Sequence, residues 1–356
     1  MLVPEMRDRV AELLHRAGAL GALMQLRRIA PVPSLPIITY HHIADDDANY
    51  AYDPTIADAT PEQFRRQMEL LTRHFTPIGI DELVRAIDGE PLPKNPIMVT
   101  FDDGYRSCHD AALPILRAVG VRATFFISTS FVEERRVYWW ERISMLLRCA
   151  NNRRATLAYP RTVVIDCHDP GIRDRLTAMV KNTAALDIER FLAELAHVLD
   201  VESTRAIESE YADGLLMTWD HVRALARAGM DVESHGRRHR VLQTLGDDEL
   251  VDELVGSRSD LEGQLGRPVR AFAYPVGRRI VHERRLRVAI AAAGYRVGLS
   301  NASGVNRVWP SQLRGVFPWD PFDVRRLSTD REMTDNMYLT QIAIPRFAYM
   351  SRYNRD

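Results

Sequence analysis

Residues Pro96 to Tyr105 read Pro-Ile-Met-Val-Thr-Phe-Asp-Asp-Gly-Tyr and place two adjacent carboxylates directly after a short apolar run. The apolar run predicts a buried strand, and Gly104 gives the backbone freedom to turn as the strand ends. Within a regular strand Asp102 and Asp103 would point to opposite faces, but at a turning strand end both can face one cavity. Two close carboxylates that do not share a proton need a positive partner, such as a metal or a cationic side chain. The alternative interpretation is a solvated Asp-Asp-Gly turn, which is common.

Strands and helices alternate on both sides of this stretch, as in parallel βα units. Upstream, residues 37–43 predict a strand that ends in paired histidines, and Thr60 followed by Pro61 predicts the start of a helix. Downstream we expect a helix, a strand, a long interruption and further strand–helix pairs, at residues 111–119, 123–127, 132–215 and 218–297. The interruption shows no strand–helix repeat, so we interpret it as a mainly helical insertion over one face. The predicted fold class is α/β, as one elaborated domain.

Charge, cysteine content and hydrophobicity exclude several classes of protein. With 47 Lys and Arg against 48 Asp and Glu, the chain has no overall field that would recruit nucleic acid. Its cysteines, Cys108, Cys149 and Cys167, are too few and too scattered for a disulfide framework or a cysteine-based zinc site. No run approaches about 18 apolar residues, and the first residues lack the order of a signal peptide, so we expect a cytoplasmic protein.

The N-terminal region predicts an amphipathic helix from Glu5 to Arg28, because apolar residues recur on one face beside several arginines. A proline-rich connector at residues 30–36 ends it. We expect this helix to pack on the body of the domain. The alternative is peripheral contact with an anionic membrane surface.

A second candidate site begins where the strand at residues 230–234 ends, with the sequence His235-Gly-Arg-Arg-His239. On a helical turn the two imidazoles would lie on one face and could bind one cation. This spacing alone is weak evidence, and a structural or surface pair is the default interpretation. Its position favours a site, because the carboxyl ends of barrel strands converge and Asp103 also follows a strand. Two histidines and one aspartate would leave coordination positions open, as in catalytic metal sites.

A third strand end, Phe272-Ala-Tyr-Pro-Val-Gly277, completes an ordered set of motifs. Together the three motifs resemble those of the polysaccharide deacetylases, the carbohydrate esterase family 4 or NodB-homology enzymes. The resemblance implies a distorted (β/α) barrel of the NodB type at residues 36–328, with the insertion at about 132–215. Residues 1–35 would form the N-terminal helix and connector, and residues 329–356 a C-terminal tail. It further implies that Asp102 is the catalytic base and that Asp103, His235 and His239 bind a divalent metal, usually zinc.

The chain departs from the best-known form of the family, in which a late histidine is the general acid and an arginine precedes the third motif. Ala273 stands where that arginine would fall, and no histidine follows His282. A branch resembling exopolysaccharide N-deacetylases instead takes the acid from an early Tyr-His pair, which Tyr40 and His41 match. We therefore expect His41 to be the acid and the neighbouring His42 to be structural.

Further departures, at Gly236 and Val276, concern substrate contacts more than the metal site. Tyr105 and Tyr274 are expected to bind substrate in the groove. Trp139 and Trp140 would either stack on sugar rings or belong to the core. Arg237 and Arg238 would either meet an anionic glycan precursor or form a solvated face.

The expected function is metal-dependent hydrolysis of an N-acetyl group on an amino sugar of a bacterial surface or extracellular glycan, or of its precursor. Removal of an O-acetyl or N-formyl group involves the same chemistry and stays open. A non-catalytic glycan-binding module is the alternative from a different class. The combination of Asp102 and His41 argues against it, because a module that only binds has no need of an acid and a base.

Overall fold

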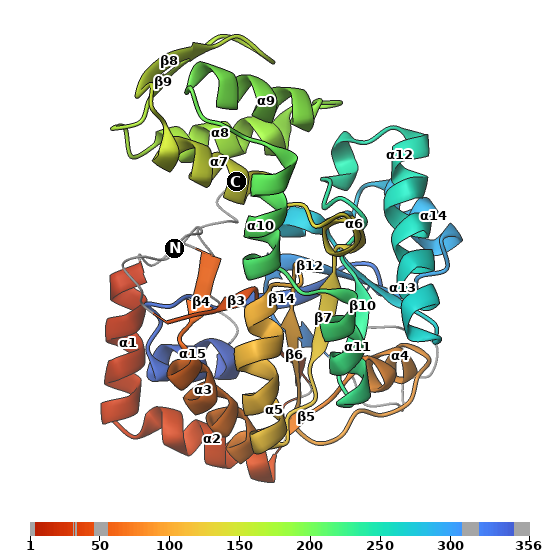
Figure 1. Cartoon of the computed structure of the whole chain (residues 1–356). Helices are drawn as coiled ribbons and strands as arrows, with labels where there is room; N and C mark the ends of the chain where they lie inside the picture. Colours follow the sequence, from red (N-terminus) through yellow and green to blue (C-terminus); the bar gives the residue numbers. More distant parts are fainter. Residues whose placement is uncertain (1–3, 31, 33, 46–55, 308–319, 345–356) are drawn as a thin grey trace.

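The computed structural model describes residues 4–30, 32, 34–45, 56–307 and 320–344 (Figure 1). Seven parallel strands form a closed barrel, because β14 pairs with β2 at the seam. In order around the barrel they are β2 (Ile37–Tyr40), β6 (Pro96–Phe101), β7 (Thr124–Ile127), β10 (Asp231–Ser234), β11 (Ala271–Ala273), β12 (Val297–Ser303) and β14 (Val324–Ser328). The expected α/β fold with a distorted (β/α) barrel is confirmed.

Strand register decides which side chains meet at the mouth of the barrel. Alternate residues of a strand point inward, and the inward positions form a small apolar cluster that includes Ile37, Met98, Phe126, Ala273 and Leu299. Continuing the same alternation past the carboxyl ends of the strands brings polar side chains to one cleft, among them His41, Asp102, His235 and Asn301. The barrel therefore gathers residues from distant parts of the sequence at one end.

Helices cover the outside of the barrel, and a larger apolar cluster lies between them and the strands. They are α3 (Pro61–His74), α4 (Ile80–Ile87), the π-helix η2 (Cys108–Ala112) with α5 (Leu113–Val119), α6 (Thr129–Glu134), α11 (Trp219–Arg227), α12 (Asp247–Val251), the π-helix η4 (Asp252–Gly256), α13 (Ser257–Leu265) and α14 (Arg284–Ala292). The predicted start of α3 is confirmed, because Thr60 Oγ1 accepts a hydrogen bond from Gln63 N.

Short strands and turns complete the barrel. β5 (Thr76–Pro77) extends the sheet beside β6, and β3 (His42–Ile43) pairs with β4 (Ala57–Ala59). β1 (Ser34–Leu35) pairs with β13 (Asn306–Arg307), while η3 (Leu242–Thr244) and η5 (Pro275–Gly277) are single 3-10 turns. The strand expected over residues 37–43 is thus two strands, β2 and β3, with a bend at His41.

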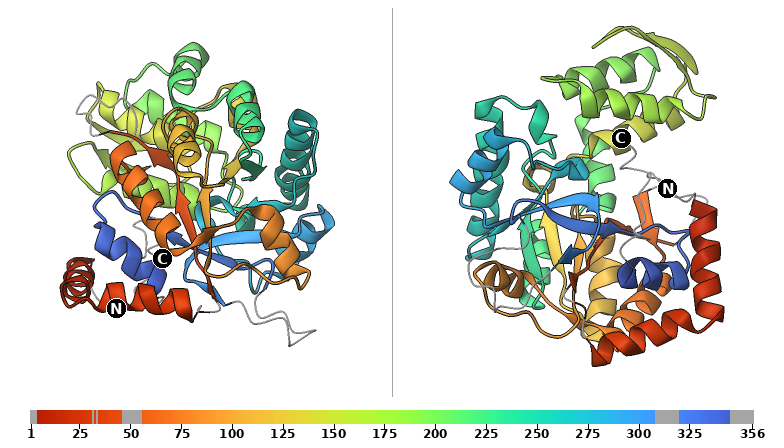
Figure 2. Two further views of the ribbon diagram at one scale, coloured as in Figure 1. Left: turned by 90° about the horizontal axis from the view of Figure 1, so that it is seen from below. Right: turned by 180° about the vertical axis from the view of Figure 1, so that it is seen from behind.

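The insertion forms a lobe at the carboxyl ends of the strands (Figures 1 and 2). Its elements are α7 (Trp139–Cys149), the antiparallel hairpin β8 (Arg154–Leu157) and β9 (Val163–Asp166), α8 (Ile172–Asn182), α9 (Ile188–Val198) and α10 (Arg205–Leu215). The lobe is mainly helical, as expected, and it supplies one wall of the cleft.

Two helices, and not one, form the N-terminal region. α1 (Pro4–Arg16) and α2 (Ala19–Ile29) meet at Gly18, whose φ of 69° ends the first helix. Both contact α15 (Asp335–Ala343), which lies beside them in Figure 1. Leu20 and Met24 of α2 are buried in the larger apolar cluster. None of the described helices is long and apolar enough to cross a membrane.

Candidate active site

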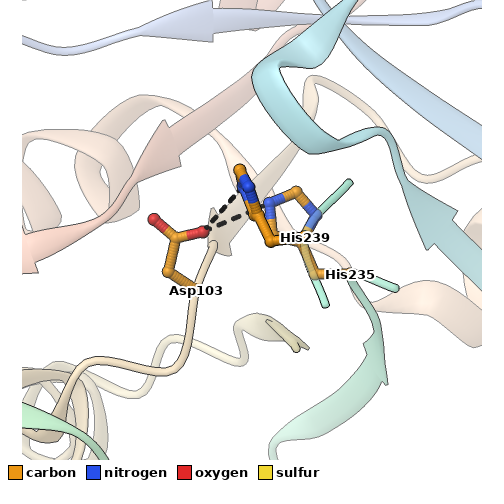
Figure 3. A group of neighbouring side chains, drawn as sticks. All are labelled: Asp103, His235 and His239. Carbon is orange, nitrogen blue, oxygen red and sulfur yellow. Dashed lines mark ion pairs between the residues drawn. The ribbon is translucent and has the colours of Figure 1, made fainter. Parts of the chain in front are cut away.

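Asp103, His235 and His239 converge at the mouth of the barrel (Figure 3). Asp103 Oδ1 lies 3.3 Å from His235 Nε2 and 3.3 Å from His239 Nε2. One ligand atom of each residue falls within 4.8 Å of the others, and all three residues are buried. Asp103 follows β6 and both histidines follow β10, so two strand ends separated by β7 build the group.

The backbone at two of these residues is unusual, because Asp103 has a φ of 72° and His239 a φ of 51°. Residues other than glycine rarely adopt this left-handed region, and such strain persists only where the surroundings hold it. At Asp103 the carbonyl oxygen accepts a hydrogen bond from Tyr138 of the insertion. In the second loop the carboxylate of Glu253 accepts hydrogen bonds from the backbone N–H groups of Arg237 and Arg238, both at 2.8 Å. His235 and His239 therefore lie in a clamped loop, and not on the helical turn that their spacing suggested.

The group fits a divalent cation of the zinc type. Asp103 Oδ1 is buried and has no hydrogen-bond partner among the described residues. His235 Nδ1 lies 2.8 Å from the carbonyl oxygen of Ala273, to which it donates, so its Nε2 lone pair faces Asp103. One carboxylate and two neutral imidazoles are a donor set that zinc prefers, with positions left open for water and substrate.

Asp102 has a different partner, the guanidinium of Arg326. Arg326 Nη1 and Nη2 each donate a 2.7 Å hydrogen bond to one carboxylate oxygen of Asp102. The pair is almost fully buried, with side-chain exposures of 0% for Arg326 and 1% for Asp102. Burial alone would raise the pKa of Asp102, but the charges of Arg326 and then His235 hold that pKa below its usual value. The carboxylate is therefore ionised beside the three ligand residues, 3.9 Å from His235 Nε2.

His41 faces the same cleft from the bend between β2 and β3. Its Nδ1 lies 3.1 Å from Asp58 Oδ2, and its backbone N–H donates to the same oxygen. Burial would lower the pKa of His41, but the charge of Asp58 and the hydrogen bond to it outweigh burial and raise the pKa to about 9. His42 takes the other side of the strand, where Ser107 Oγ is 2.7 Å from its Nδ1. Burial, followed by repulsion from Arg331, lowers the pKa of His42 to about 4.

These side chains line one open cleft. The barrel contributes its polar floor, and the insertion contributes a wall from α7 and α8. Trp140 on α7 packs edge-on against the ring of His239, with 4.6 Å between centroids, and stacks on Tyr138 at 4.3 Å. The described residues that line the cleft are His41, Ile56, Asp102, Asp103, Trp139, Trp140, Arg173, Thr177, Lys181, His235, His239, Val276, Asn301 and Ser328.

Comparison with known proteins agrees with this arrangement. A family model described as polysaccharide deacetylase matches residues 89–298, more than half of the chain. The chain belongs to the polysaccharide deacetylase family.

A curated relative of this chain, the poly-beta-1,6-N-acetyl-D-glucosamine N-deacetylase of Escherichia coli K12, is 33% identical over 82 residues. That alignment covers 23% of this chain and 12% of the relative, so this chain matches only a small part of it. Among solved structures, the deacetylase PplD of Streptococcus pyogenes, in complex with acetate, has 18% identity and a TM-score of 0.55 over 88% of this chain and 99% of its own. IcaB of Ammonifex degensii has 16% identity and a TM-score of 0.51 over 87% and 96%. Both structures support the fold.

Two residues that were expected from the sequence to bind substrate, Tyr105 and Tyr274, are not among the described residues that line the cleft. Tyr105 is fully buried, and its hydroxyl lies 3.3 Å from Glu141 Oε1 and accepts a hydrogen bond from Trp140. Tyr274 is 1% exposed, and its hydroxyl donates to the carbonyl oxygen of Phe322. Because both hydroxyls are used inside the protein, the structure gives these tyrosines a supporting position in place of the predicted contact with substrate.

The departures at Gly236 and Val276 have local explanations. A Cβ at Gly236 would lie 2.6 Å from Glu253 Oε2, and the φ of Gly236 is 82°. Glycine is thus required where the family usually has serine or threonine, because the clamping carboxylate fills the space. Val276 lines the cleft at a φ of 63°. Arg237 is paired with Asp252 and Asp260, so it does not extend into the cleft as an anion-binding residue.

Sequence reasoning missed Arg326 and Asp58. Arg326 lies on β14 in the inward register, with its guanidinium over the ring of Phe126. It supplies a cation beside Asp102, whereas Ala273 occupies the position where the best-known form of the family has an arginine. Asp58 lies between two buried alanines on β4. An acidic residue inside a short apolar run was the one feature of the sequence that could have indicated a buried carboxylate there. Neither partner is apparent until β14 and β4 are placed beside the strands they accompany.

Proposed function

We propose that this chain is a zinc-dependent N-deacetylase of an acetylated amino-sugar polysaccharide or its precursor. The observation that carries the proposal is one cleft that combines an ion-paired aspartate, a three-residue ligand group and a histidine with a raised pKa. In the proposal Asp103, His235 and His239 hold the cation. When bound there, a divalent cation polarises the acyl carbonyl and makes a water molecule more acidic.

Asp102 takes the proton of the attacking water at a carboxylate oxygen. Arg326 has two effects on that step. Its charge keeps the carboxylate ionised before the reaction, and its fork of two hydrogen bonds fixes the plane of the carboxylate. Since the ion pair is buried, the carboxylate reaches this orientation without ordering solvent.

His41 gives a proton to the nitrogen of the leaving amine as the C–N bond breaks. An amine is a poor leaving group unless it is protonated, so this step needs a general acid. A pKa of about 9 keeps His41 protonated at neutral pH. Asp58 at Nδ1 orients the imidazole and keeps the other nitrogen available to the cleft.

The test is a screen of acyl sugars with zinc-reconstituted protein, scored for released acetate or formate. We expect acetate from an N-acetyl amino sugar. Formate as the product, or turnover of O-acetyl sugars alone, would replace the N-acetyl assignment. Metal binding with no turnover of any acyl sugar would support the non-catalytic module.

A variant pair tests the acid in the same screen. His41→Ala should lower deacetylation of an N-acetyl sugar by about 10²–10⁴-fold while largely sparing an activated aryl acetate, whose phenolate leaves without a proton. His42→Ala is the control and should not separate the two substrates. Equal losses on both substrates with His41→Ala would assign His41 to binding or structure.

A further inference from the structure

The turn that carries Asp103 is hydrogen-bonded to both ends of the insertion. Three consecutive residues of this turn each accept one hydrogen bond, through the carbonyl oxygens of Asp103 and Gly104 and the hydroxyl of Tyr105. The donors, in the same order, are the hydroxyl of Tyr138, the backbone N–H of Met217 at 3.0 Å and Nε1 of Trp140 at 3.0 Å. Tyr138 and Trp140 lie at the start of the insertion, and Met217 lies two residues after α10, its last helix. The insertion therefore clamps the turn from two sides.

Arg135 joins these two ends to each other. Its guanidinium donates hydrogen bonds to three carbonyl oxygens in and after the last turn of α10, those of Ala212, Leu216 and Met217. The segment before Tyr138 is thus fastened to the segment that contains Met217. Because the two ends are held together, a displacement of either one is transmitted to the turn that carries Asp103.

The two histidines of the ligand group are oriented in different ways. His235 Nδ1 donates to the carbonyl oxygen of Ala273 at 2.8 Å, so a strand of the barrel fixes the plane of that ring. His239 Nδ1 is buried and has no hydrogen-bond partner among the described residues. The orientation of the His239 ring must therefore come from packing.

Aromatic rings of the insertion supply that packing. The ring of His239 meets Trp140 at 4.6 Å and Tyr138 at 5.8 Å between centroids, both in edge-to-face geometry, which is favourable for aromatic pairs. Tyr138 and Trp140 are themselves stacked at 4.3 Å with an angle of 10° between their planes. The Tyr105 hydroxyl fixes Nε1 of the same indole. One stacked pair thus contacts His239 through its rings and Asp103 through the Tyr138 hydroxyl.

We propose that Tyr138 and Trp140 are positioning residues, through which the insertion sets the orientation of Asp103 and His239 for a divalent cation. This inference rests on the metal site of the proposed function. Partners of metal-binding side chains commonly fix the ligand geometry, and their loss typically lowers metal affinity about 10–100-fold. Coupling of this kind is reciprocal, so a bound cation must in turn stabilise the contacts between the turn and the insertion.

Zinc affinity of the full chain, measured by competition with a chelator, tests the positioning role. Tyr138→Phe keeps the stacked ring and loses the hydrogen bond to Asp103, and we expect zinc affinity to fall about 10–100-fold. Trp140→Leu removes the ring against His239 and should cause a loss of similar size. Trp140→Phe keeps an aromatic face and should recover part of that loss.

Tyr338→Phe is the matched control. It removes another buried tyrosine hydroxyl, which lies 3.0 Å from the hydroxyl of Tyr40, and Tyr338 is not among the described residues that line the cleft. Its zinc affinity should equal that of the wild-type chain. A loss in Tyr338→Phe as large as that in Tyr138→Phe would overturn the inference, because any loosening of the protein would then have the same effect.

The visible absorption of the cobalt-substituted protein separates positioning from general support of the core, because it reports the geometry around the metal. At saturating cobalt the spectra of Tyr138→Phe and Trp140→Leu should differ from that of the wild-type chain, and the spectrum of Tyr338→Phe should not. Wild-type zinc affinity and spectra in both variants, with only a less stable metal-free protein, would make Tyr138 and Trp140 core residues and overturn the inference.

Hydrogen exchange of the wild-type chain tests the coupling without any substitution. Zinc should slow exchange of the Met217 N–H, which donates to Gly104. It should leave the Asn151 N–H unchanged, since that group donates to Leu199 within the insertion. Equal exchange at Met217 with and without zinc would refute the positioning alone. Failure of the wild-type chain to bind zinc would refute the proposed function together with this inference.

Discussion

Two neighbouring aspartates at one strand end have separate partners, and that separation defines their chemistry. Asp102 faces a fixed cation of the protein, Arg326, whereas Asp103 faces two imidazoles. A carboxylate that is paired with a guanidinium does not need a metal ion to balance its charge, so its oxygens stay available to accept a proton. The sequence pattern alone makes the two residues look equivalent.

The division predicts different losses on substitution. Asp103→Ala and His239→Ala should lose zinc, while Asp102→Asn should keep zinc and lose turnover. Elemental analysis of dialysed protein, read beside activity, checks both results. A second group of possible ligands on the surface, His109, Asp110 and His221, makes His109→Ala the control for zinc bound elsewhere. Loss of zinc from Asp102→Asn as complete as from His239→Ala would contradict the division.

The contact between His41 and Asp58 predicts a pH dependence. Because the pKa of His41 is raised to about 9, the protonated acid is present at neutral pH and is lost as pH rises through about 9. The stabilisation from this contact follows the same sign, being complete below the unfolded value of about 6.5 and lost through about 9. In Asp58→Asn the attractive carboxylate is gone while burial remains, so the pKa of His41 should fall from about 9. The falling limb of kcat against pH should move with it, and an unchanged limb would rule out His41 as the titrating acid.

Among the elements, the loop that follows β10 shows how the fold holds a strained ligand. Glu253, from the π-helix η4, clamps two backbone N–H groups between His235 and His239. Burial raises the pKa of Glu253 to about 7, against the lowering effect of those hydrogen bonds. The clamp leaves no room for a side chain at Gly236.

Gly236→Ala should therefore displace the clamp. With a positive φ and a Cβ 2.6 Å from Glu253 Oε2, we expect a loss of about 1–3 kcal/mol in unfolding free energy. Zinc affinity should fall about 10–100-fold because the loop carries two ligands. Urea unfolding and competition with a chelator measure the two effects. Gly263→Ala on α13 is the control, since nothing lies within 4 Å of a Cβ there, and it should be neutral or stabilising. A Gly236→Ala protein with normal zinc affinity would show that the clamp does not set the ligand geometry.

Local signals predicted some elements of the site and not others. Asp103 and the histidine pair were found because a strand followed at once by polar residues is visible in the sequence. The burial of Tyr105 and Tyr274 was not predicted, because exposure of a tyrosine depends on neighbours such as Trp140 and Phe322 that come from other segments. Arg326 lies 224 positions from Asp102, and only the closed barrel register brings the two together.

At the scale of the whole molecule, the N-terminal helices belong to the packed body. Leu20 and Met24 are buried, Glu12 accepts a hydrogen bond from Asn336 of α15, and the carbonyl oxygen of Arg27 accepts one from Asn95. Burial of large apolar side chains contributes about 1.5–3 kcal/mol each. The packing predicted from the apolar stripe is consistent with these contacts.

Deletion of residues 1–30 should accordingly lower thermal stability, by an amount equivalent to at least about 3–6 kcal/mol for the two buried side chains of α2. Calorimetry or a circular-dichroism melt provides the measurement. Sedimentation with anionic vesicles should be the same for the full and the shortened chain. Vesicle binding that disappears on deletion, with stability unchanged, would instead assign these helices to a membrane surface.

The seam of the barrel has a consequence for the order in which the cleft is assembled. Residues 89–298, which match the family model, contain Asp102 and the three ligand residues, but His41 and Asp58 precede this segment and Arg326 follows it. As the chain leaves the ribosome, Asp102 is therefore synthesised more than two hundred residues before its cation. Until β14 docks against β2, burying Asp102 would leave an unpaired charge, which is strongly unfavourable. A nascent chain that ends before Val324 contains Asp103, His235 and His239 but lacks the partner of Asp102, so assembly of the cleft waits for the last strand of the barrel.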